Sequence, residues 1–178
     1  ITDEIFVRIE GKSFKANCTT PREDLRYLRV LHYNKDREVQ EGELICHKDI
    51  ADDLLAIFQE LYKAAYPIER MVLIDEYDAD DEASMRANNT SAFNFRYASG
   101  MKRLSSHSTG MAIDINPLYN PLVRYREGQT RVFPTTAAAY MDRTKYFPYK
   151  IEKGDLCYRL FKKYGFSWGG DWKSSKDY

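Results

Sequence analysis

The chain has few of the residues that hold small disulfide-rich or zinc-rich domains together. Its 178 residues include only three cysteines, Cys18, Cys46 and Cys157, and no Cys-x-x-Cys pair. This is too few for a disulfide scaffold, and it excludes a cysteine-rich structural zinc site. One disulfide with one free thiol and three buried thiols both fit the sequence.

The chain also lacks an excess of charge of either sign, and it lacks long apolar runs. Lys and Arg number 27, as do Asp and Glu, so the composition gives no electrostatic case for nucleic acid or an anionic membrane surface. No apolar run approaches the roughly 18 residues of a membrane span. No signal peptide is visible at residues 1–4, and this start fits both a removed leader and a cytosolic protein. A phosphate-binding glycine loop and a His-Glu-x-x-His helix are missing too.

What is present is the composition of a folded domain. Hydrophobic residues make up 43% of the chain and charged residues 30%, and the length is sufficient for one buried core. Because there is no internal repeat or linker, we predict a single domain over residues 1–178. The predicted elements lack a βαβ rhythm, so the expected fold class is α+β, a small antiparallel sheet flanked by helices.

Two elements are predicted from local pattern and turn residues. Residues 25–33 and 38–45 are rich in apolar and β-favouring residues on either side of a polar turn, which predicts a hairpin. Asp49 is a predicted cap for a helix over about residues 50–65, whose apolar residues recur at helical spacing, and Pro67 ends it.

The remaining elements have weaker signals. An acidic stretch over residues 75–82 lacks the glycine and closing glutamate of a calcium loop and is interpreted as a solvated surface loop. The other predictions are strands at residues 70–77, 112–116 and 166–168, a loop at 120–136, and a helix at 155–164 closed by Gly165.

The most specific feature is the segment at residues 105–114, Ser-Ser-His-Ser-Thr-Gly-Met-Ala-Ile-Asp, which fits S-x-H-x-x-G-x-A-x-D. His nitrogen and Asp oxygen both suit zinc, so His107 and Asp114 are candidate metal ligands. Gly110 interrupts any helix and the residues after it favour a strand, so we place the two ligands on separate limbs with a bend at Gly110. A bare His–Asp pair is weak evidence, because most histidines bind no metal, but five matching positions are far more specific.

This segment resembles the zinc peptidases of the D-alanyl-D-alanine carboxypeptidase, D-Ala-D-Ala dipeptidase and phage L-alanyl-D-glutamate endopeptidase group, the M15 peptidases. Their catalytic fold is shared with the hedgehog signalling domain. The likeness covers roughly residues 42–178 and is strongest from Asn88 onward. It implies a hedgehog/DD-peptidase-like fold in which His107 and Asp114 bind one zinc ion.

The resemblance also implies roles for other residues. Residues 88–96 look like the family segment whose final arginine faces the scissile carbonyl, which implies that Arg96 stabilises the oxyanion; a solvated arginine is the alternative. Asp177 stands where the family has its general base, which draws a proton from water and passes it to the leaving amine. Ser105 has no evident base that would make it a nucleophile, and it is expected to support the site by hydrogen bonding.

The third zinc ligand of the family is a histidine three residues after this acid. That position would be the second past Tyr178, outside the sequence. We therefore expect the chain to be part of a longer protein, with a natural early end as the alternative. Neither His32 nor His47 has a ligand-like context, so the zinc site is expected to be incomplete and at most weakly filled in this chain.

The predicted function is a zinc-dependent metallopeptidase that hydrolyses peptidoglycan stem peptides. The bond would be D-Ala-D-Ala, cut as a carboxypeptidase, or L-Ala-D-Glu, cut internally; the substrate rests on the resemblance alone. A periplasmic or extracellular location follows from that substrate. The alternative is a catalytically inactive peptidase-like domain that binds cell-wall peptides or a protein partner. Trp168 and Trp172 fit either the walls of a substrate groove or buried anchors of the C-terminal turn.

Overall fold

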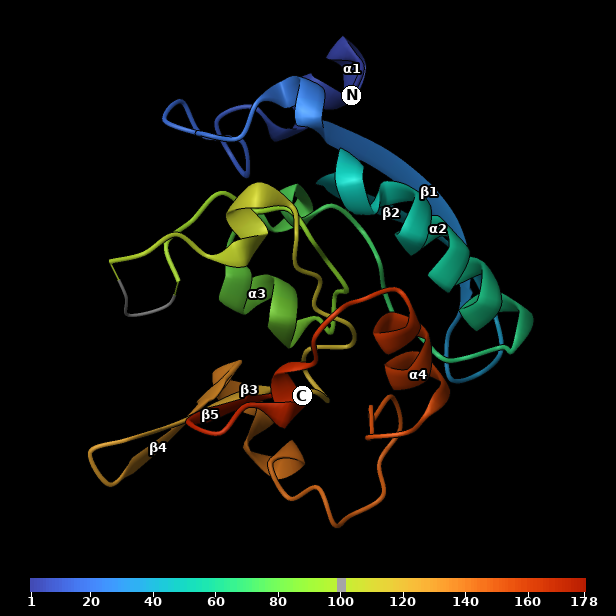
Figure 1. Cartoon of the computed structure of the whole chain (residues 1–178), viewed down its shortest axis with the longest axis vertical. Helices are drawn as coiled ribbons and strands as arrows, with labels where there is room; N and C mark the ends of the chain where they lie inside the picture. Colours follow the sequence, from blue (N-terminus) through green and yellow to red (C-terminus); the bar gives the residue numbers. More distant parts are fainter. Residues whose placement is uncertain (99–101) are drawn as a thin grey trace.

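Helices and strands are mixed in the structure, which confirms the predicted α+β class (Figure 1). The computed structural model describes residues 1–98 and 102–178. Within these residues the strands form two small antiparallel sheets, one of two strands and one of three, where a single sheet was predicted. None of the helices in this part of the chain has the length and apolarity needed to cross a membrane.

The two-stranded sheet is the predicted hairpin. β1 (Leu25–Tyr33) and β2 (Val39–His47) pair over their full length, with Leu25 opposite His47 at one end and Tyr33 opposite Val39 at the other. Alternate residues of each strand face the main core, since successive side chains of a strand point to opposite faces. The residues buried there are Leu28, Val30, Leu44 and Cys46.

α2 (Lys48–Lys63) covers this face of the hairpin, because its apolar residues form one stripe. The helix begins earlier than predicted, and its cap is His47, whose Nδ1 accepts a hydrogen bond from the backbone N–H of Asp49 at 3.2 Å. The predicted cap, Asp49, lies in the first turn, where its negative charge still favours the helix. The buried residues of the stripe are Ile50, Leu54, Ile57, Phe58 and Leu61.

The N-terminal segment packs in a second apolar cluster. α1 (Asp3–Ile9) and the short helix η1 (Arg22–Asp24) precede β1. Within the cluster, Phe93 and Phe95 hold the segment that leads to Arg96, so the N-terminal residues help to position one wall of the site. The buried members are Ile9, Leu25, Ile45, Leu73, Phe93 and Phe95.

Residues 70–77 do not form the predicted strand. The chain turns into η2 (Ile74–Tyr77) and then α3 (Asp81–Arg86). Asp75 is buried and accepts hydrogen bonds from the backbone N–H and the hydroxyl of Ser13, at 2.9 and 3.0 Å, which ties this segment to the N-terminal region instead of to a neighbouring strand. Asp75 is therefore part of the buried structure and not of a solvated loop, whereas Glu76, Asp78 and Asp80 are exposed, as the prediction has it.

The prediction of a loop at residues 120–136 is wrong as well. It contains β3 (Leu122–Arg126) and β4 (Gln129–Phe133), and β5 (Ser175–Asp177) completes a sheet with the order β4-β3-β5. The turn is Glu127-Gly128, with φ of 51° and 74°, which is the two-residue type that matches the twist of paired strands. Exposed, charged residues along both strands give this hairpin the composition of a loop.

Two other predicted strands, at residues 112–116 and 166–168, are absent from the structure. Residues 112–116 make a single bridge, between Ser91 and Asp114. Residues 166–168 are irregular and lead into η5 (Gly169–Asp171), and the last strand forms later, at β5.

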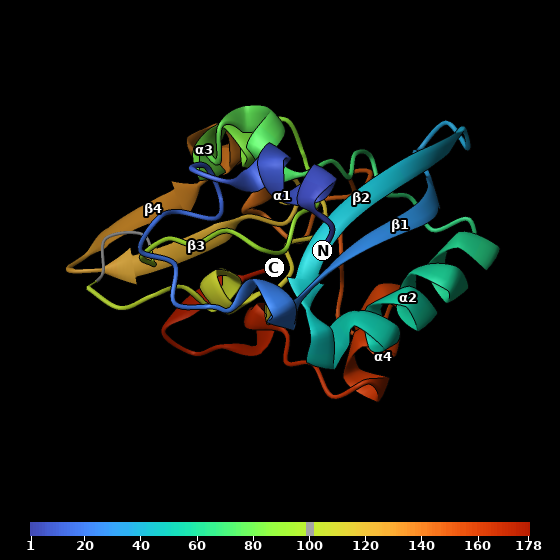
Figure 2. The same cartoon turned by 90° about the horizontal axis from the view of Figure 1, so that it is seen from above.

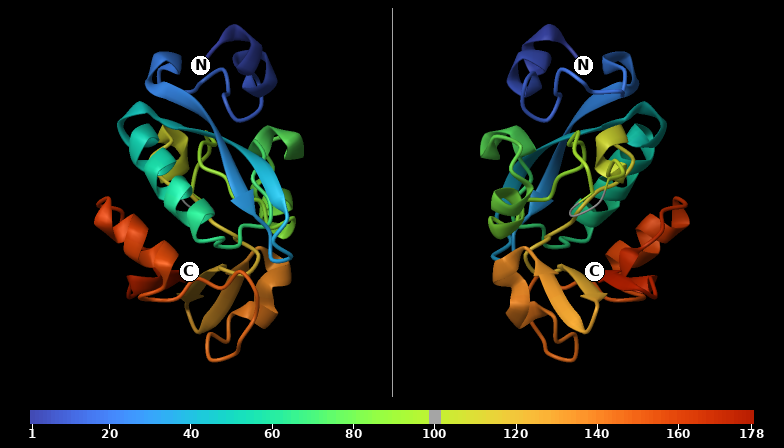
Figure 3. Two further views of the ribbon diagram at one scale, coloured as in Figure 1. Left: turned by 90° about the vertical axis from the view of Figure 1, so that its right-hand side faces the viewer. Right: turned by 90° about the vertical axis from the view of Figure 1, so that its left-hand side faces the viewer.

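The C-terminal helix is close to its prediction. α4 (Leu156–Lys163) is capped by Asp155, and Gly165 follows with φ 84°. It lies beside α2 (Figure 2), while η4 (Thr135–Tyr140) lies with the three-stranded sheet at the end of the molecule opposite α1 (Figure 3). The three cysteines are free thiols, so no disulfide joins these elements.

Candidate metal centre

The motif segment forms a tight turn held by its own small side chains. η3 (Ser106–Thr109) begins after Ser105, whose Oγ accepts a hydrogen bond from the backbone N–H of His107 at 3.3 Å. This bond satisfies a free donor at the start of the turn. Ser105 thus fixes the backbone that carries His107.

Gly110 ends this turn and provides the predicted bend. Its φ is 70°, a conformation that favours glycine, and its carbonyl accepts a hydrogen bond from the backbone N–H of His47 at 3.0 Å. A Cβ atom at this position would lie 2.6 Å from the His47 nitrogen. The absence of a side chain therefore lets the turn dock against the end of β2.

His107 and Asp114 face one another across this bend. The Nε2 atom of His107 lies 3.4 Å from Oδ2 of Asp114. Nδ1 of the same ring is 2.6 Å from the carbonyl oxygen of Ala92, and because a carbonyl can only accept, Nδ1 carries the donated proton. Asp114 is held by two backbone hydrogen bonds with Ser91, of 2.9 and 3.1 Å. Both side chains are thus oriented before any ligand arrives.

Burial and mutual attraction set the charges of these groups. Burial alone would lower the pKa of His107, but the charge and hydrogen bond of Asp114 raise it to about 9. Burial acts to raise the pKa of Asp114, yet the positive charges of His107 and Arg96 keep it below its usual value. The two residues therefore form an ion pair at neutral pH.

Asp177 lies next to this pair on β5, where it is opposite Leu122 of β3. Burial raises its pKa to about 7, and the negative charge of Asp114 adds to the shift, while nearby His107 and Arg124 oppose it. Gly169 makes the close packing possible, because a Cβ atom there would lie 2.4 Å from Cβ of Asp177.

Arg96 is held by two residues that the sequence did not single out. Its guanidinium pairs with Asp81 at 2.6 Å. The hydroxyl of Ser108 accepts from the backbone N–H of Arg96 at 3.0 Å and donates to its carbonyl at 2.6 Å. Nothing in the sequence separates Asp81 from its acidic neighbours, and the Ser108 contact depends on two segments meeting, so neither had a local signal.

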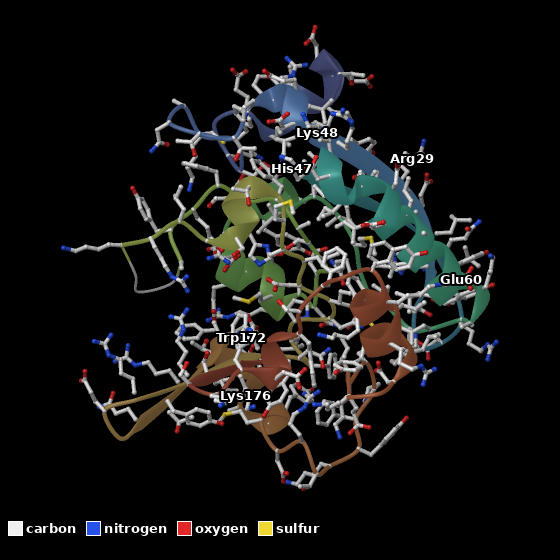
Figure 4. The ribbon with its side chains drawn as sticks, in the orientation of Figure 1. Arg29, His47, Lys48, Glu60, Trp172 and Lys176 are labelled. Atoms are coloured by element: carbon white, nitrogen blue, oxygen red, sulfur yellow. The ribbon has the colours of Figure 1, made fainter. Side chains whose placement is uncertain are left out.

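These residues border one cleft of about 830 Å³, a size typical of ligand sites. Tyr158 and Phe161 of α4 and both tryptophans contribute an aromatic wall. Trp172 is 46% exposed and is labelled in Figure 4. All five predicted site residues line this cleft: Arg96, Ser105, His107, Asp114 and Asp177.

The other two histidines lie elsewhere. His32 is buried, with Nδ1 2.7 Å from the carbonyl oxygen of Ile68. His47 caps α2 and is well apart from Trp172 at the cleft (Figure 4). Neither is among the described residues that line the cleft.

The donor chemistry of the pair fits a zinc ion. Among residues 1–98 and 102–178, no three His, Cys, Asp or Glu side chains come together as a metal site. His107 and Asp114 nonetheless offer an imidazole nitrogen and a carboxylate oxygen that face each other, with the ring oriented through its other nitrogen, as zinc-binding histidines are. They would hold the ion as two of its ligands.

An α+β fold with a His–Asp pair, an acid and an arginine in one cleft defines a candidate metallohydrolase. Residues 99–178 match the family model of D-alanyl-D-alanine carboxypeptidases, which confirms the resemblance to M15-type peptidases and supports a hydrolase. The match includes the pair and Asp177 but begins after Arg96. No curated protein and no solved structure matches the chain.

Proposed function

We propose that this protein is a zinc-dependent metallopeptidase that hydrolyses peptidoglycan stem peptides, in the periplasm or outside the cell. The bond is D-Ala-D-Ala or L-Ala-D-Glu. The observation that carries the proposal is the 3.4 Å approach of His107 Nε2 to Asp114 Oδ2, in a cleft that also contains Asp177 and Arg96. The family match of residues 99–178 supports the peptidase class.

His107 and Asp114 hold the metal in this proposal. When bound, zinc supplies Lewis acidity that polarises a peptide carbonyl and makes water a better nucleophile at neutral pH. The hydrogen bond from His107 Nδ1 to the carbonyl of Ala92 keeps Nε2 directed into the cleft.

Asp177 moves the proton. With a pKa of about 7, its carboxylate is poised to accept a proton on Oδ from the attacking water and to return it to the leaving amine. A carboxylate at its ordinary pKa would be a weaker base, so the buried position of β5 is what suits this residue to the role.

Arg96 stabilises developing negative charge on the substrate oxygen. Asp81 and Ser108 hold it in place, so little reorganisation is needed during the reaction. Its Nε is buried and has no hydrogen-bond partner within the part of the chain that the structure describes.

Hydrolysis of defined muropeptides tests this function, with zinc added to the chain extended by two residues, the second a histidine, and with products identified by mass spectrometry. We expect His107→Ala to abolish hydrolysis and Asp177→Asn to slow it by roughly 10²- to 10⁴-fold. His47→Ala is the matched control, because its side chain lies outside the cleft, and it should retain the activity. Equal activity in His107→Ala and the control would show the proposal to be wrong.

The ligand set has its own test, because the resemblance implies a histidine as the third ligand. Zinc affinity is measured by calorimetry on the chain as printed and on a chain extended by two residues, the second a histidine. We expect the extension to strengthen zinc binding by at least about tenfold, since a third ligand adds to the total binding energy. An extension ending in alanine is the control, and equal affinities of the two extended chains would contradict the ligand set.

A further inference from the structure

The first 24 residues of the chain form an arm that precedes β1 and lies outside the part matched by the family model, residues 99–178. Figure 2 shows this N-terminal arm, in blue, beside the turn η3, in yellow. Its first attachment to the site is a hydrogen bond of 3.0 Å from the backbone N–H of Phe95 to the carbonyl oxygen of Ser13. Because Phe95 directly precedes Arg96, the arm is fastened next to one wall of the cleft.

Thr20 makes the contact of the arm that lies nearest to the candidate metal ligands in sequence. Its Oγ1 donates a hydrogen bond of 2.8 Å to the carbonyl oxygen of Ser108, which is 88 positions further along the chain. Both residues are buried, with 6% and 0% of their surface exposed. A buried carbonyl oxygen is costly without a donor, so this bond favours one position of the turn. Ser108 directly follows His107, and Thr20 therefore holds the turn at the residue beside a candidate ligand.

Ser108 extends this constraint to the other wall of the cleft. Its hydroxyl bonds to the backbone N–H and the carbonyl of Arg96, at 3.0 and 2.6 Å. The carbonyl of His107 accepts a further bond of 3.0 Å from the backbone N–H of Asn94. The two segments are thus fastened to each other, and Thr20 holds them from the arm. Thr20 is not among the described residues that line the cleft, so it acts on the site through these neighbours.

We infer that Thr20 is a positioning residue of the candidate metal centre, whose hydroxyl, through the carbonyl of Ser108, holds His107 and Arg96 in the geometry that zinc and substrate require. The partner is a carbonyl, which only accepts, so a donor is needed at this position. The inference rests on the proposed function for the reaction in which His107 and Arg96 act. Its effect on zinc binding does not depend on hydrolysis.

Variants of Thr20 separate the hydroxyl from the shape of the side chain. Thr20→Val keeps the shape and removes the donor. Thr20→Ser and Thr20→Ala both lack the methyl group and differ from each other only in the hydroxyl, so this pair decides the question even if Thr20→Val does not fold. Thr19→Val is the matched control, because it makes the same change at the neighbouring, exposed threonine.

Each variant is made in the chain extended by two residues, the second a histidine, and its folding is checked by circular dichroism. Zinc affinity is measured by calorimetry, and kcat and KM are measured on a muropeptide. We expect Thr20→Val and Thr20→Ala to bind zinc at least about tenfold more weakly, as is typical when a residue that orients a ligand is changed. Their kcat should fall about tenfold with KM changed less than about twofold, because Arg96 acts on charge that develops during the reaction. Loss of stability alone would not lower kcat in a protein that remains folded.

Thr20→Ser should retain zinc affinity and kcat within about threefold, and Thr19→Val should leave both unchanged. Equal zinc affinity and kcat in Thr20→Ser and Thr20→Ala would overturn the inference, because the hydroxyl would then be irrelevant. If the unaltered extended chain binds zinc but hydrolyses no muropeptide, the proposed function fails, and the zinc affinities still decide the role of Thr20. Hydrolysis that is equal in all variants, with equal zinc affinities, leaves the proposed function and removes this role. A chain that binds no zinc at all counts against both.

Discussion

His107 and Asp114 fix each other's charge because both are largely withdrawn from water. In that environment an isolated charge is costly, but the ion pair, at 3.4 Å, raises the pKa of His107 to about 9 and lowers that of Asp114. A histidine binds a metal as the neutral imidazole, so a zinc ion at this site would have to displace a proton that Asp114 helps to retain.

This competition predicts a pH dependence of zinc binding. Below about pH 9 His107 is protonated, and each bound zinc releases one proton, so the apparent affinity should rise about tenfold for each pH unit up to that value and then level off. Calorimetry in buffers of different ionisation enthalpy measures both the affinity and the released proton. His47→Ala should keep this slope, and an affinity that is constant between about pH 7 and 8.5 would contradict the pKa of His107.

At the scale of elements, the site depends on how closely η3 approaches the end of β2. The carbonyl of Gly110 accepts a hydrogen bond from the backbone of His47, and the carbonyl of Ala92 accepts one from the ring of His107. The turn is therefore fastened to two separate parts of the core, and its distance from them sets where the imidazole lies.

Gly110→Ala should disturb both stability and the site. The new Cβ atom combines a strained positive φ with a 2.6 Å contact to the His47 nitrogen, so we expect the free energy of unfolding to fall by about 3 kcal/mol. Gly165→Ala is the matched control, because Gly165 also has positive φ but open space around its Cβ position, and only the strain of about 1 kcal/mol should appear. Urea unfolding measures both variants, and equal losses would mean that the close approach is unimportant.

The elements that could be predicted from the sequence are those with local signals. The β1–β2 hairpin and α2 follow from apolar spacing and turn residues, and the pair of candidate ligands follows from one short motif. η2 could not be predicted, because the hydrogen bonds of Asp75 go to Ser13, far away in the sequence. The ion pair of Asp81 could not be predicted for the same reason, since its partner Arg96 belongs to another segment.

At the scale of the whole molecule, Arg143 joins the segments that precede and follow the β3–β4 hairpin in the sequence. It donates to the carbonyls of Tyr119 and Ile151 at 2.6 and 2.8 Å, and to the side-chain oxygen of Asn120 at 3.0 Å. Its guanidinium also lies 4.5 Å from the ring centroid of Tyr178, next to the candidate base. Burial lowers the pKa of Arg143 to about 10, so it is charged near neutral pH.

Removal of this cation should weaken the whole fold. Arg143→Met loses several charge-assisted hydrogen bonds and leaves their acceptors unsatisfied, and we expect the free energy of unfolding to fall by about 3 kcal/mol. Arg131→Met, at an exposed position of β4, is the control and should change stability by less than about 0.5 kcal/mol. Chemical denaturation compares the two, and similar midpoints would refute a connecting role for Arg143.

The position of the aromatic wall has a practical consequence. Trp168 and Trp172 are the two tryptophans of the chain, and both border the cleft. Indole emission from the unlabelled protein therefore originates where ligands would enter. Peptide or metal titrations can be followed optically without attaching a dye, and quenching by acrylamide should fall when the opening is filled.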